Sequence, residues 1–503
     1  MHTMTQMNWL VVYPEILLLI AACVVALVDL GVTEPRRRLT FWLTQASLAG
    51  VAVMHAVALK NGLGTEGAAA SVYAMQGLVV SDPMGHLLAL CAALAMMLTI
   101  AYAQPYNGSR ELQKGEFFSL SMFVLLGISV MISANNFLVI YVGLELMSLS
   151  LYALAALRRD HGVSTEAAMK YFVLGALASG FLLYGMSMMY GATGSLQIDE
   201  VFDVISKGGV NSTVLTFGVV FIVAGLAFKL GVVPFHMWVP DVYQGTPTSV
   251  TLLISGAPKL AAFAITLRVL VEGLSGLAQD WQEMLIVLSV LSMALGNLAA
   301  VAQTNLKRML AYSAIAQLGF MLLGFTPTVI QGDTASAANG YSSALFYIIT
   351  YVMTTLATFG LIMFLSREGF ESEEVNDLAG LARRKPWLAG VMTVLMFSLA
   401  GVPPMVGFYA KFAVVQALVS TNVHGYIVLA IVAVLLSLIG AFYYLRIVKV
   451  MYFDPPKDAT PVASQGGVGV LLACNGAAAL VLGLLPDGLM GLCRDVILAA
   501  LAG

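Results

Sequence analysis

The chain has 503 residues, of which 60% are hydrophobic and only 10% are charged, and its formal net charge is -3. Soluble domains carry about 25% charged residues, so this composition excludes a soluble domain, a disordered chain and a collagen-like fibre. The four cysteines form no closely spaced pair, and the scattered charges form no basic patch, which argues against a disulfide scaffold, a zinc or iron–sulfur site and nucleic-acid binding. The class of protein that this composition leaves open is a polytopic membrane protein.

Apolar runs that are long enough to cross a bilayer recur along the whole chain. A spanning helix needs about 20 mostly apolar residues, and about fourteen runs meet this length. They lie near residues 8–30, 39–59, 84–103, 116–133, 136–157, 166–190, 213–241, 250–272, 282–302, 309–324, 341–365, 386–420, 424–451 and 466–488. The sequence therefore predicts an all-α polytopic membrane protein in which no connection is long enough for a soluble domain.

Positive charge is concentrated in alternate connections. The basic residues that follow odd-numbered spans are Arg36, Arg37, Arg38, Arg110, Lys114, Arg158, Arg159, Lys307, Arg308, Arg367, Arg383, Arg384, Lys385, Lys449 and Lys457. The other connections hold little beyond Lys60 and Lys207. The positive-inside rule places the basic connections in the cytoplasm and both termini on the opposite side. No basic region precedes the first apolar run, so no cleaved signal peptide is expected.

A small set of charged residues falls inside the predicted spans: Glu145, Lys229, Lys259 and Lys411. A charge at mid-bilayer costs about 2.5–3.5 kcal/mol on insertion scales, so this set indicates a shared polar interior. A structural ion pair is the alternative, but one glutamate cannot neutralise three lysines pairwise. Snorkelling to the membrane surface is the alternative for Lys170 and Arg268, which lie near span ends.

A lysine inside the membrane suits proton transfer. Desolvation disfavours the ammonium form of a lysine, whereas a neighbouring carboxylate favours it. A change in the separation of Glu145 and Lys229 would therefore switch the lysine between holding and releasing its proton. Arginine cannot deprotonate in a protein, so this hypothesis predicts that Lys229→Arg fails nearly as badly as Lys229→Ala.

Two spans contain interruptions of the same kind, Gly231-Val-Val-Pro234 and Gly401-Val-Pro-Pro404, which lie 170 positions apart. Glycine and proline break helices, and irregular backbone at membrane depth is tolerated only inside protein or facing water. Paired interruptions point to a transport repeat with its ion site at the breaks, with an ordinary proline kink as the alternative. The same offset carries Glu145 to Ile315 and Lys259 to Leu429, so the charges are not fully duplicated.

Polar side chains continue between these charges. They are Tyr347, Thr350, Tyr351, Thr354 and Thr358 along one face of the eleventh span, and Ser313 and Gln317 on the tenth. These groups are expected to hold a file of waters, or alternatively to form helix-to-helix hydrogen bonds. His236 is a candidate relay because histidine titrates near physiological pH. No role is assigned to the histidines that stand alone, which are His55, His86, His161 and His424.

Several segments carry a resemblance to a known family. They are Tyr141-Val-Gly-Leu-Glu-Leu-Met-Ser-Leu, Phe228-Lys-Leu-Gly-Val-Val-Pro-Phe-His-Met-Trp-Val-Pro-Asp-Val-Tyr-Gln-Gly-Thr-Pro, Gly256-Ala-Pro-Lys, Asn305-Leu-Lys-Arg-Met-Leu-Ala-Tyr-Ser-Ala-Ile-Ala-Gln, and Gly401-Val-Pro-Pro with Lys411. Together they resemble the antiporter-like membrane subunits of proton-translocating NADH:quinone oxidoreductase, respiratory complex I. The likeness covers nearly the whole chain.

The resemblance implies two inverted five-helix repeats, at 116–272 and 282–451, each with a broken helix. An N-terminal three-helix segment at 1–115 precedes them, and a C-terminal helix and tail at 452–503 follow. It also implies that Glu145, Lys229, Lys259 and Lys411 are the protonatable groups of a central hydrophilic axis. A lysine at position 411 resembles subunit N of the family; subunit M has glutamate there, and subunit L carries a long lateral helix for which this chain leaves no room.

The resemblance further implies the partners and the compartment. The chain is expected to bind other membrane subunits of complex I and the lipid of the bacterial inner (plasma) membrane, with both termini on the periplasmic side. No nucleotide loop or metal-ligand spacing is present, so we expect no cofactor in this chain; FMN, iron–sulfur clusters and quinone belong to partner subunits. The alternatives are a subunit of a multisubunit sodium/proton antiporter and, from a different class, a purely scaffolding membrane protein.

Overall fold

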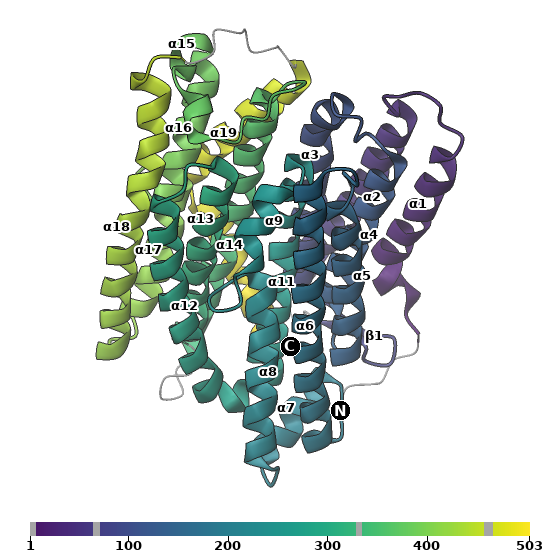
Figure 1. The fold of residues 1–503 in the computed structure, drawn as a ribbon. Helices are drawn as coiled ribbons and strands as arrows, with labels where there is room; N and C mark the ends of the chain where they lie inside the picture. Colours follow the sequence, from purple (N-terminus) through teal and green to yellow (C-terminus); the bar gives the residue numbers. More distant parts are fainter. Residues whose placement is uncertain (1–6, 64–70, 328–333, 457–465, 503) are drawn as a thin grey trace.

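The computed structural model describes residues 7–63, 71–327, 334–456 and 466–502. These residues form a bundle of long helices whose axes run roughly side by side (Figure 1). Thirteen helices in the described ranges are long and apolar enough to cross a bilayer. The remaining predicted span consists of two shorter apolar helices, α16 (Pro386–Ala400) and α17 (Val406–Val419). The prediction of an all-α polytopic protein with about fourteen spans is therefore confirmed.

The first helices form one edge of the bundle, drawn in purple and blue in Figure 1. A short 3-10 turn, η1 (Trp9–Val12), leads into α1 (Tyr13–Asp29), followed by α2 (Arg38–Leu63) and α3 (Pro83–Gly108). The connection before α3 contains a two-stranded antiparallel hairpin of β1 (Val72–Ala74) and β2 (Val79–Ser81), in which Tyr73 pairs with Val80. Strands this short leave too little alternation in the sequence to be predicted.

The elements that follow surround the first helix break. They are α4 (Gly115–Ser133), α5 (Phe137–Ala155), α6 (Gly162–Thr193), α7 (Ile198–Lys207), α8 (Ser212–Leu230), α9 (Trp238–Gly245), α10 (Thr248–Ser255), α11 (Pro258–Thr266) and the π-helix η2 (Leu267–Gly273). The side chain of Asn136 caps the start of α5. Glycines let α4 approach α5 closely, since a Cβ on Gly127 would lie 2.5 Å from the backbone nitrogen of Met147. This contact fixes the helix that carries Glu145.

The elements around the second break follow in the same way. They are η3 (Ser275–Leu277), α12 (Ala278–Val301), α13 (Leu306–Leu322), η4 (Leu323–Phe325), α14 (Thr334–Leu365), η5 (Val375–Leu378), α15 (Leu381–Arg384), α16, α17 and α18 (His424–Phe453). The long α14 packs against both halves of the molecule, because it contacts α3, α10 and α11 as well as α13, α16 and α17.

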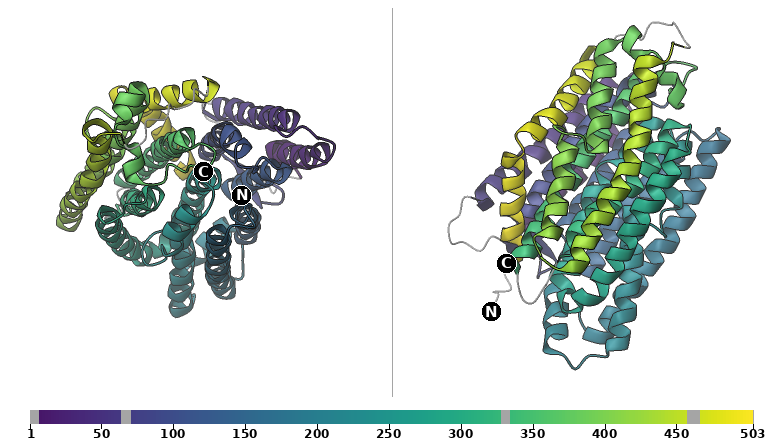
Figure 2. Two further views of the ribbon diagram at one scale, coloured as in Figure 1. Left: turned by 45° about the horizontal axis from the view of Figure 1, so that its top comes forward. Right: turned by 90° about the vertical axis from the view of Figure 1, so that its left-hand side faces the viewer.

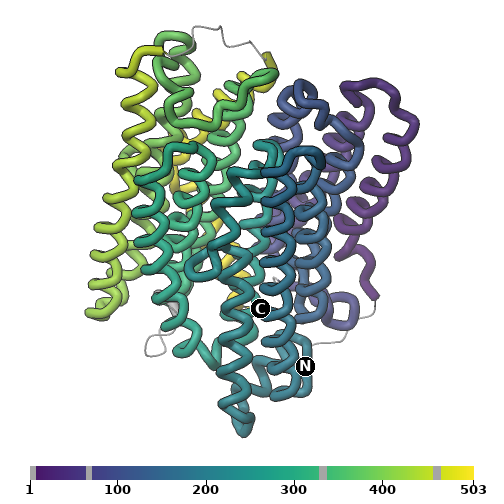
Figure 3. Tube along the Cα trace, viewed as in Figure 1, coloured from purple at the N-terminus to yellow at the C-terminus, as the bar shows by residue number. Residues whose placement is uncertain are grey.

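The chain ends in two helices, α19 (Gly466–Leu484) and α20 (Asp487–Ala502). The sequence predicts one helix and a tail here, but the tail folds as α20 and packs against α3 and α14. Asp487, Arg494 and Asp495 interrupt the apolar run, which is why composition alone does not identify this helix. Both termini lie toward the same end of the bundle, and the basic connections lie at the other (Figures 1 and 3).

Burial distinguishes the inner helices from the outer ones. In the apolar 18-residue stretch of Thr248–Gly273, 100% of the residues are buried. In the corresponding stretches of Trp9–Asp29 and His424–Phe453, only 22% of the residues are buried. The first helices and α18 accordingly lie at opposite edges of the bundle (Figure 2). The span that carries Lys259 is thus enclosed by protein, and α1 and α18 present apolar side chains to the outside.

Candidate functional site: charged residues at two helix breaks

The first break lies where α8 ends. Gly231 has a φ of 82°, a left-handed conformation that favours glycine, and residues 232–237 form turns before α9 begins. The last carbonyl groups of a helix lack helical donors, and a lysine supplies them here. Lys259 Nζ donates to the carbonyl oxygen of Lys229 at 3.1 Å and to that of Leu230 at 3.2 Å. The helix dipole also favours a cation at this end.

The second break has the same arrangement. α16 ends at Ala400, and Gly401 has a φ of 84°. Lys411 Nζ donates to the carbonyl oxygen of Leu399 at 3.0 Å, to that of Ala400 at 3.1 Å and to Ser437 Oγ at 2.9 Å. The offset of 170 positions that relates the two breaks takes residues 229 and 230 to 399 and 400. An ammonium group therefore binds the equivalent pair of carbonyl oxygens at each break.

Glu145 and Lys229 meet across α5 and α8. Lys229 Nζ donates to Ser148 Oγ at 2.9 Å, and Ser148 lies one turn after Glu145 on α5. Glu145 is near enough to act electrostatically on Lys229, and Lys229 in turn acts on Lys259. The Oε1 atom of Glu145 is buried and has no hydrogen-bond partner among the described residues. The structure thus brings three of the four predicted charges together at the first break.

Simple ion pairing does not account for these charges. Within the described ranges, no ion pair with an N–O distance of 4.0 Å or less involves Glu145, Lys229, Lys259 or Lys411. The three lysines are bound by carbonyl and hydroxyl oxygen atoms instead. The structure therefore gives no support to the ion-pair alternative.

Snorkelling is wrong for Arg268. Its side chain is only 1% exposed, and its Nη2 atom donates to Asp82 Oδ1 at 2.8 Å while Nη1 lies 3.3 Å from Glu272. Its Nε atom donates to the carbonyl oxygen of Ile132 at 2.7 Å. The distant partner Asp82, which precedes α3, holds the arginine inside the bundle. Lys170 does reach the surface, where it pairs with Glu166 and Asp241.

The predicted hydroxyl stripe is buried and leads to the second break. Gln317 Nε2 donates to the carbonyl oxygen of Leu399 at 2.9 Å, the same oxygen that Lys411 binds, and Gln317 Oε1 accepts a hydrogen bond from Tyr347. A cavity of about 20 Å³ beside them is lined by Gln317, Tyr347, Thr350, Tyr351 and Thr354. A cavity of about 10–15 Å³ is enough for one water.

The alternative of helix-to-helix hydrogen bonds holds for Ser313, Gln317 and Tyr347, whose side chains bond to side chains of other helices. The threonines of the stripe instead donate within their own helix. The hydroxyl groups of Thr350, Thr354 and Thr358 each donate to a carbonyl oxygen of α14 itself, at 2.8–2.9 Å. Their oxygen atoms remain able to accept a hydrogen bond from water. A second cavity of about 10 Å³ continues the stripe past Ser313 and Thr358. A continuous file of waters stays a prediction.

His236 lies at the first break, but no hydrogen bond among the described residues joins it to Lys229 or Lys259. It is half-buried in the turn between α8 and α9, and its Nδ1 atom is buried without a hydrogen-bond partner among the described residues. Its role as a relay stays a prediction. Within the part of the chain that the structure describes, no group of three or more histidine, cysteine, aspartate or glutamate side chains is arranged to hold a metal ion.

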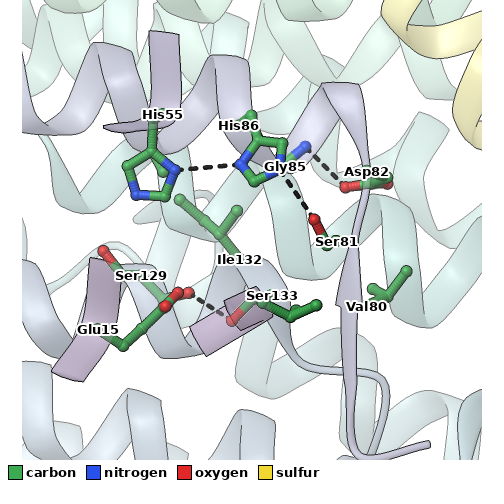
Figure 4. Close-up of a pocket in the computed structure, with 12 residues that line it drawn as sticks. Glu15, His55, Val80, Ser81, Asp82, Gly85, His86, Ser129, Ile132 and Ser133 are labelled. Carbon is green, nitrogen blue, oxygen red and sulfur yellow. Dashed lines mark hydrogen bonds between the residues drawn. The ribbon is translucent and has the colours of Figure 1, made fainter. Parts of the chain in front are cut away.

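Sequence patterns do not pair His55 with His86, yet their Nδ1 atoms lie 3.2 Å apart (Figure 4). They are 31 residues apart on α2 and α3, and the one available signal is that each lies close to the connection between these helices. Lys307 is also more buried than its position in a basic connection predicts. It is 1% exposed and its Nζ atom binds Glu373 and the carbonyl oxygen of Thr246, each at 2.8 Å.

Comparison with known proteins identifies relatives over nearly the whole chain. The family model described as NADH:quinone oxidoreductase/Mrp antiporter, TM, matches residues 134–451. The NADH-quinone oxidoreductase subunit N of Polaromonas naphthalenivorans is 58% identical, over 98% of this chain and 98% of its own length. The protein of the same name from Herminiimonas arsenicoxydans is also 58% identical, over 99% of this chain and 100% of its own length.

Solved structures share the fold. A chain in the structure of respiratory complex I from Thermus thermophilus is 30% identical, with a TM-score of 0.78 over 95% of this chain and 98% of that one. A chain of the Mrp complex from Dietzia sp. is 22% identical, with a TM-score of 0.82 over 97% and 96% of the two chains. At that identity, the second likeness concerns the fold alone.

Proposed function

The chain belongs to the NADH:quinone oxidoreductase/Mrp antiporter family of membrane subunits, and from that premise we propose that it translocates protons through Glu145, Lys229, Lys259 and Lys411. Relatives with 58% identity over nearly the full length are N subunits of NADH-quinone oxidoreductase. The chain is accordingly a membrane subunit of complex I that works in a hetero-oligomer with other membrane subunits. Mrp-type antiport is the second candidate, and the weaker sequence likeness disfavours it.

The observation that carries the proposal is the pair of lysines bound at the two breaks. Lys411 Nζ has three oxygen acceptors, and an ammonium group has three N–H donors, so the site fits the protonated form. Loss of the proton leaves an amine with a lone pair. A serine hydroxyl can then reverse its role and donate to that lone pair, whereas a carbonyl oxygen cannot.

Serine hydroxyl groups are present at two of the three lysines. Ser437 accepts from Lys411 and Ser148 accepts from Lys229, each at 2.9 Å. We infer that these two lysines gain and lose protons while their serines reverse direction. Lys259 differs from the other two lysines, because its acceptors are two carbonyl oxygen atoms and the Trp238 ring, 5.3 Å from Nζ, with no serine hydroxyl among its described partners.

Glu145 would set the protonation of Lys229. A carboxylate close to the lysine stabilises its ammonium form, and withdrawal of the carboxylate favours release of the proton. Ser148 lies on the same helix as Glu145, so a movement of α5 would change both contacts of Lys229 together. In this proposal the driving force comes from quinone reduction in partner subunits, which would carry the FMN and the iron–sulfur clusters.

The fold organisation that goes with this function is a pair of inverted repeats, at 116–272 and 282–451. The two broken helices are the seventh and the twelfth spans, and helices five spans apart cross the membrane in opposite directions. Equivalent breaks, each beginning with a left-handed glycine, support this proposal. We also propose that both termini face the periplasm, because the basic connections lie at the opposite end of the bundle.

The test is reconstitution of the whole complex into proteoliposomes with Lys229→Ala, Glu145→Gln or Lys411→Ala in this chain. NADH:quinone turnover and proton pumping are measured separately, and assembly is checked by the recovery of flavin and iron–sulfur subunits. We expect assembled complexes with strongly reduced pumping. Pumping equal to that of the unchanged complex in all three variants would leave a scaffolding role, and a purified complex without redox subunits would favour the antiporter.

A further inference from the structure

A second group of titratable side chains lies apart from the two breaks, among α1, α2, α3 and α4 (Figure 4). Glu15 is on α1, His55 on α2 and His86 on α3. They surround a cavity of about 20 Å³, which is enough for one water. The proposed proton path through the lysines does not use any of these groups.

The two histidines and a serine form a hydrogen-bonded chain. His86 Nε2 lies 2.9 Å from Ser81 Oγ, and His86 Nδ1 lies 3.2 Å from His55 Nδ1. Only one proton fits between the two Nδ1 atoms, because one ring must donate while the other accepts. When His86 donates, the proton of neutral His55 is on Nε2, the atom at the far end of the chain.

His55 Nε2, the last atom of this hydrogen-bonded row, faces other polar atoms that lack partners among the described residues. His55 Nε2, Glu15 Oε2 and Ser129 Oγ are buried, line the cavity and have no hydrogen-bond partner among the described residues. The other side of the Glu15 carboxylate accepts from Ser133. A buried water needs about two to four polar partners, and three unsatisfied atoms around a water-sized cavity meet this need. The geometry thus points to one bound water that connects His55 to Glu15.

Ser81, at the other end of this row of hydrogen-bonded side chains, lies next to a larger cavity. Val80 and Asp82 line both the small cavity and a larger one of about 480 Å³, which Tyr73, Asp199 and Glu272 also line. Ser81 lies between these two shared residues and binds His86. The larger cavity also contacts Ala500 and Leu501, so it opens at the end of the bundle where both termini lie.

The other charged groups at this place are held in fixed contacts. Asp82 Oδ1 accepts from Arg268 at 2.8 Å and from the backbone nitrogen of Gly85 at 2.9 Å, and Glu272 lies 3.3 Å from the same arginine. Asp82 is therefore the counter-ion of Arg268, and its oxygen atoms stabilise that cation. The groups left to carry a proton are Ser81, His86, His55 and Glu15.

We propose that Glu15, His55 and His86 form a proton-loading site that takes up one proton from the larger cavity and returns it by the same route. A proton from water in that cavity bonds to His86 Nε2 by way of Ser81. The Nδ1–H bond of His86 breaks as an N–H bond forms at His55 Nδ1. The Nε2–H bond of His55 then breaks, and that proton passes through the bound water to the Glu15 carboxylate.

This order of transfers explains why the site binds and releases a single proton and does not pass a stream of protons through it. After one transfer both rings are neutral again, but each carries its proton on the other nitrogen. A second proton cannot bind to His86 Nε2, because that atom no longer has a free lone pair. Each transfer must therefore be reversed before the site can take up another proton. One proton per cycle follows. The proposal rests on the proposed function only for its place in proton translocation; the loading itself is a local property of these residues.

The test is proton uptake by the purified whole complex after a jump from about pH 8 to about pH 6, a range in which a carboxylate buried in apolar surroundings can take up a proton. A pH-indicator dye reports the uptake. We expect Glu15→Gln to take up one proton fewer per complex than the unchanged protein, and His55→Leu to lose the same fast uptake. Equal uptake by Glu15→Gln and the unchanged complex would overturn the proposal.

The matched control is Glu116→Gln, the same substitution at an exposed glutamate in the first turn of α4. Glu116 lies outside the proposed site, so this variant should take up as many protons as the unchanged complex. High-resolution cryo-EM of the whole complex supplies a second measurement. Density for a water between Glu15, His55 and Ser129 is expected, and a dry cavity would contradict the relay.

The two proposals can fail separately. If Lys229→Ala stops pumping while Glu15→Gln leaves the uptake unchanged, the lysine path stands and the loading site is wrong. If Lys229→Ala pumps normally while Glu15→Gln loses one proton, the loading site stands and the proposed function is wrong. NADH oxidation by each variant verifies that the complex has assembled.

Discussion

Lys259 and Lys411 bind equivalent pairs of carbonyl oxygen atoms, one pair at each helix break, although the two lysines do not occupy equivalent positions in the chain. Lys259 comes from the helix after the break, at α11, whereas Lys411 comes from α17, the second half of its own broken helix. Each break therefore binds a cation through its backbone, and the side chain that supplies the cation differs between the two halves.

Replacement of Lys229 tests whether its proton is released. Lys229→Arg keeps the positive charge but cannot deprotonate, so we expect it to abolish pumping nearly as fully as Lys229→Ala in reconstituted complex I. Lys170→Arg is the matched control, since Lys170 is a half-exposed residue in surface ion pairs. Normal pumping by the Lys229→Arg variant would show that this lysine acts only as a fixed charge.

Removal of the serine hydroxyl groups tests the proposed reversal. A hydrogen bond to a charged group contributes about 1.5–3 kcal/mol, so Ser437→Ala and Ser148→Ala should slow pumping by about tenfold or more while NADH-binding subunits stay attached. Ser420→Ala is the control, because that hydroxyl donates to its own helix at an exposed position. The measurement is the initial rate of dye quenching in proteoliposomes, and unchanged rates would exclude a role for these hydroxyl groups.

The left-handed glycines at the breaks should resist substitution. A Cβ on Gly231 would lie 2.7 Å from Val239 Cγ2, and one on Gly401 would lie 3.0 Å from Lys411 Cδ. A left-handed residue with a side chain costs about 1–2 kcal/mol before any clash. Gly231→Ala and Gly401→Ala should therefore lower the thermal stability of the complex. Gly390→Ala, where a Cβ meets nothing within 4 Å, should leave it unchanged.

The buried arginine near the loading site is expected to be structural. Arg268→Gln leaves Asp82 without its counter-ion, and removal of one partner of a buried pair costs about 3–5 kcal/mol. We expect poor assembly of the complex, measured as the recovered amount after purification. The double variant Arg268→Gln with Asp82→Asn should recover part of it, since position 82 no longer carries an unpaired charge and only Glu272 still lacks its partner. Arg158→Gln, at an exposed position, is the control.

The parts of this fold that the sequence predicts are those with local signals. Length and apolarity define the spans, and the Gly-Val-Pro interruptions mark the breaks because glycine and proline act on their own backbone. The partners of Lys259 and Lys411 are different, since a carbonyl oxygen carries no sequence signal. The sequence therefore indicates where the lysines lie along the chain but not what binds them.

Contacts between distant segments account for the features that the sequence does not predict. The sequence leaves snorkelling open as an alternative for Arg268 because its partner Asp82 lies 186 residues away. The sequence assigns no role to His55 and His86 because their contact depends on how α2 packs against α3. In each case the local sequence is compatible with an ordinary span end. Only the packing of the helices distinguishes a buried, hydrogen-bonded side chain from one at the membrane surface.

The binding of lysine by main-chain oxygen atoms has a consequence for how the two breaks tolerate substitution. No side-chain replacement at residues 229, 230, 399 or 400 removes the acceptors, so the backbone conformation alone sets the place for the cation. The amine can therefore come from different helices, α11 at the first break and α17 at the second, and still bind the same kind of acceptor pair. A comparison of the two breaks by sequence position alone would miss this shared arrangement, because the 170-residue offset places Leu429 opposite Lys259.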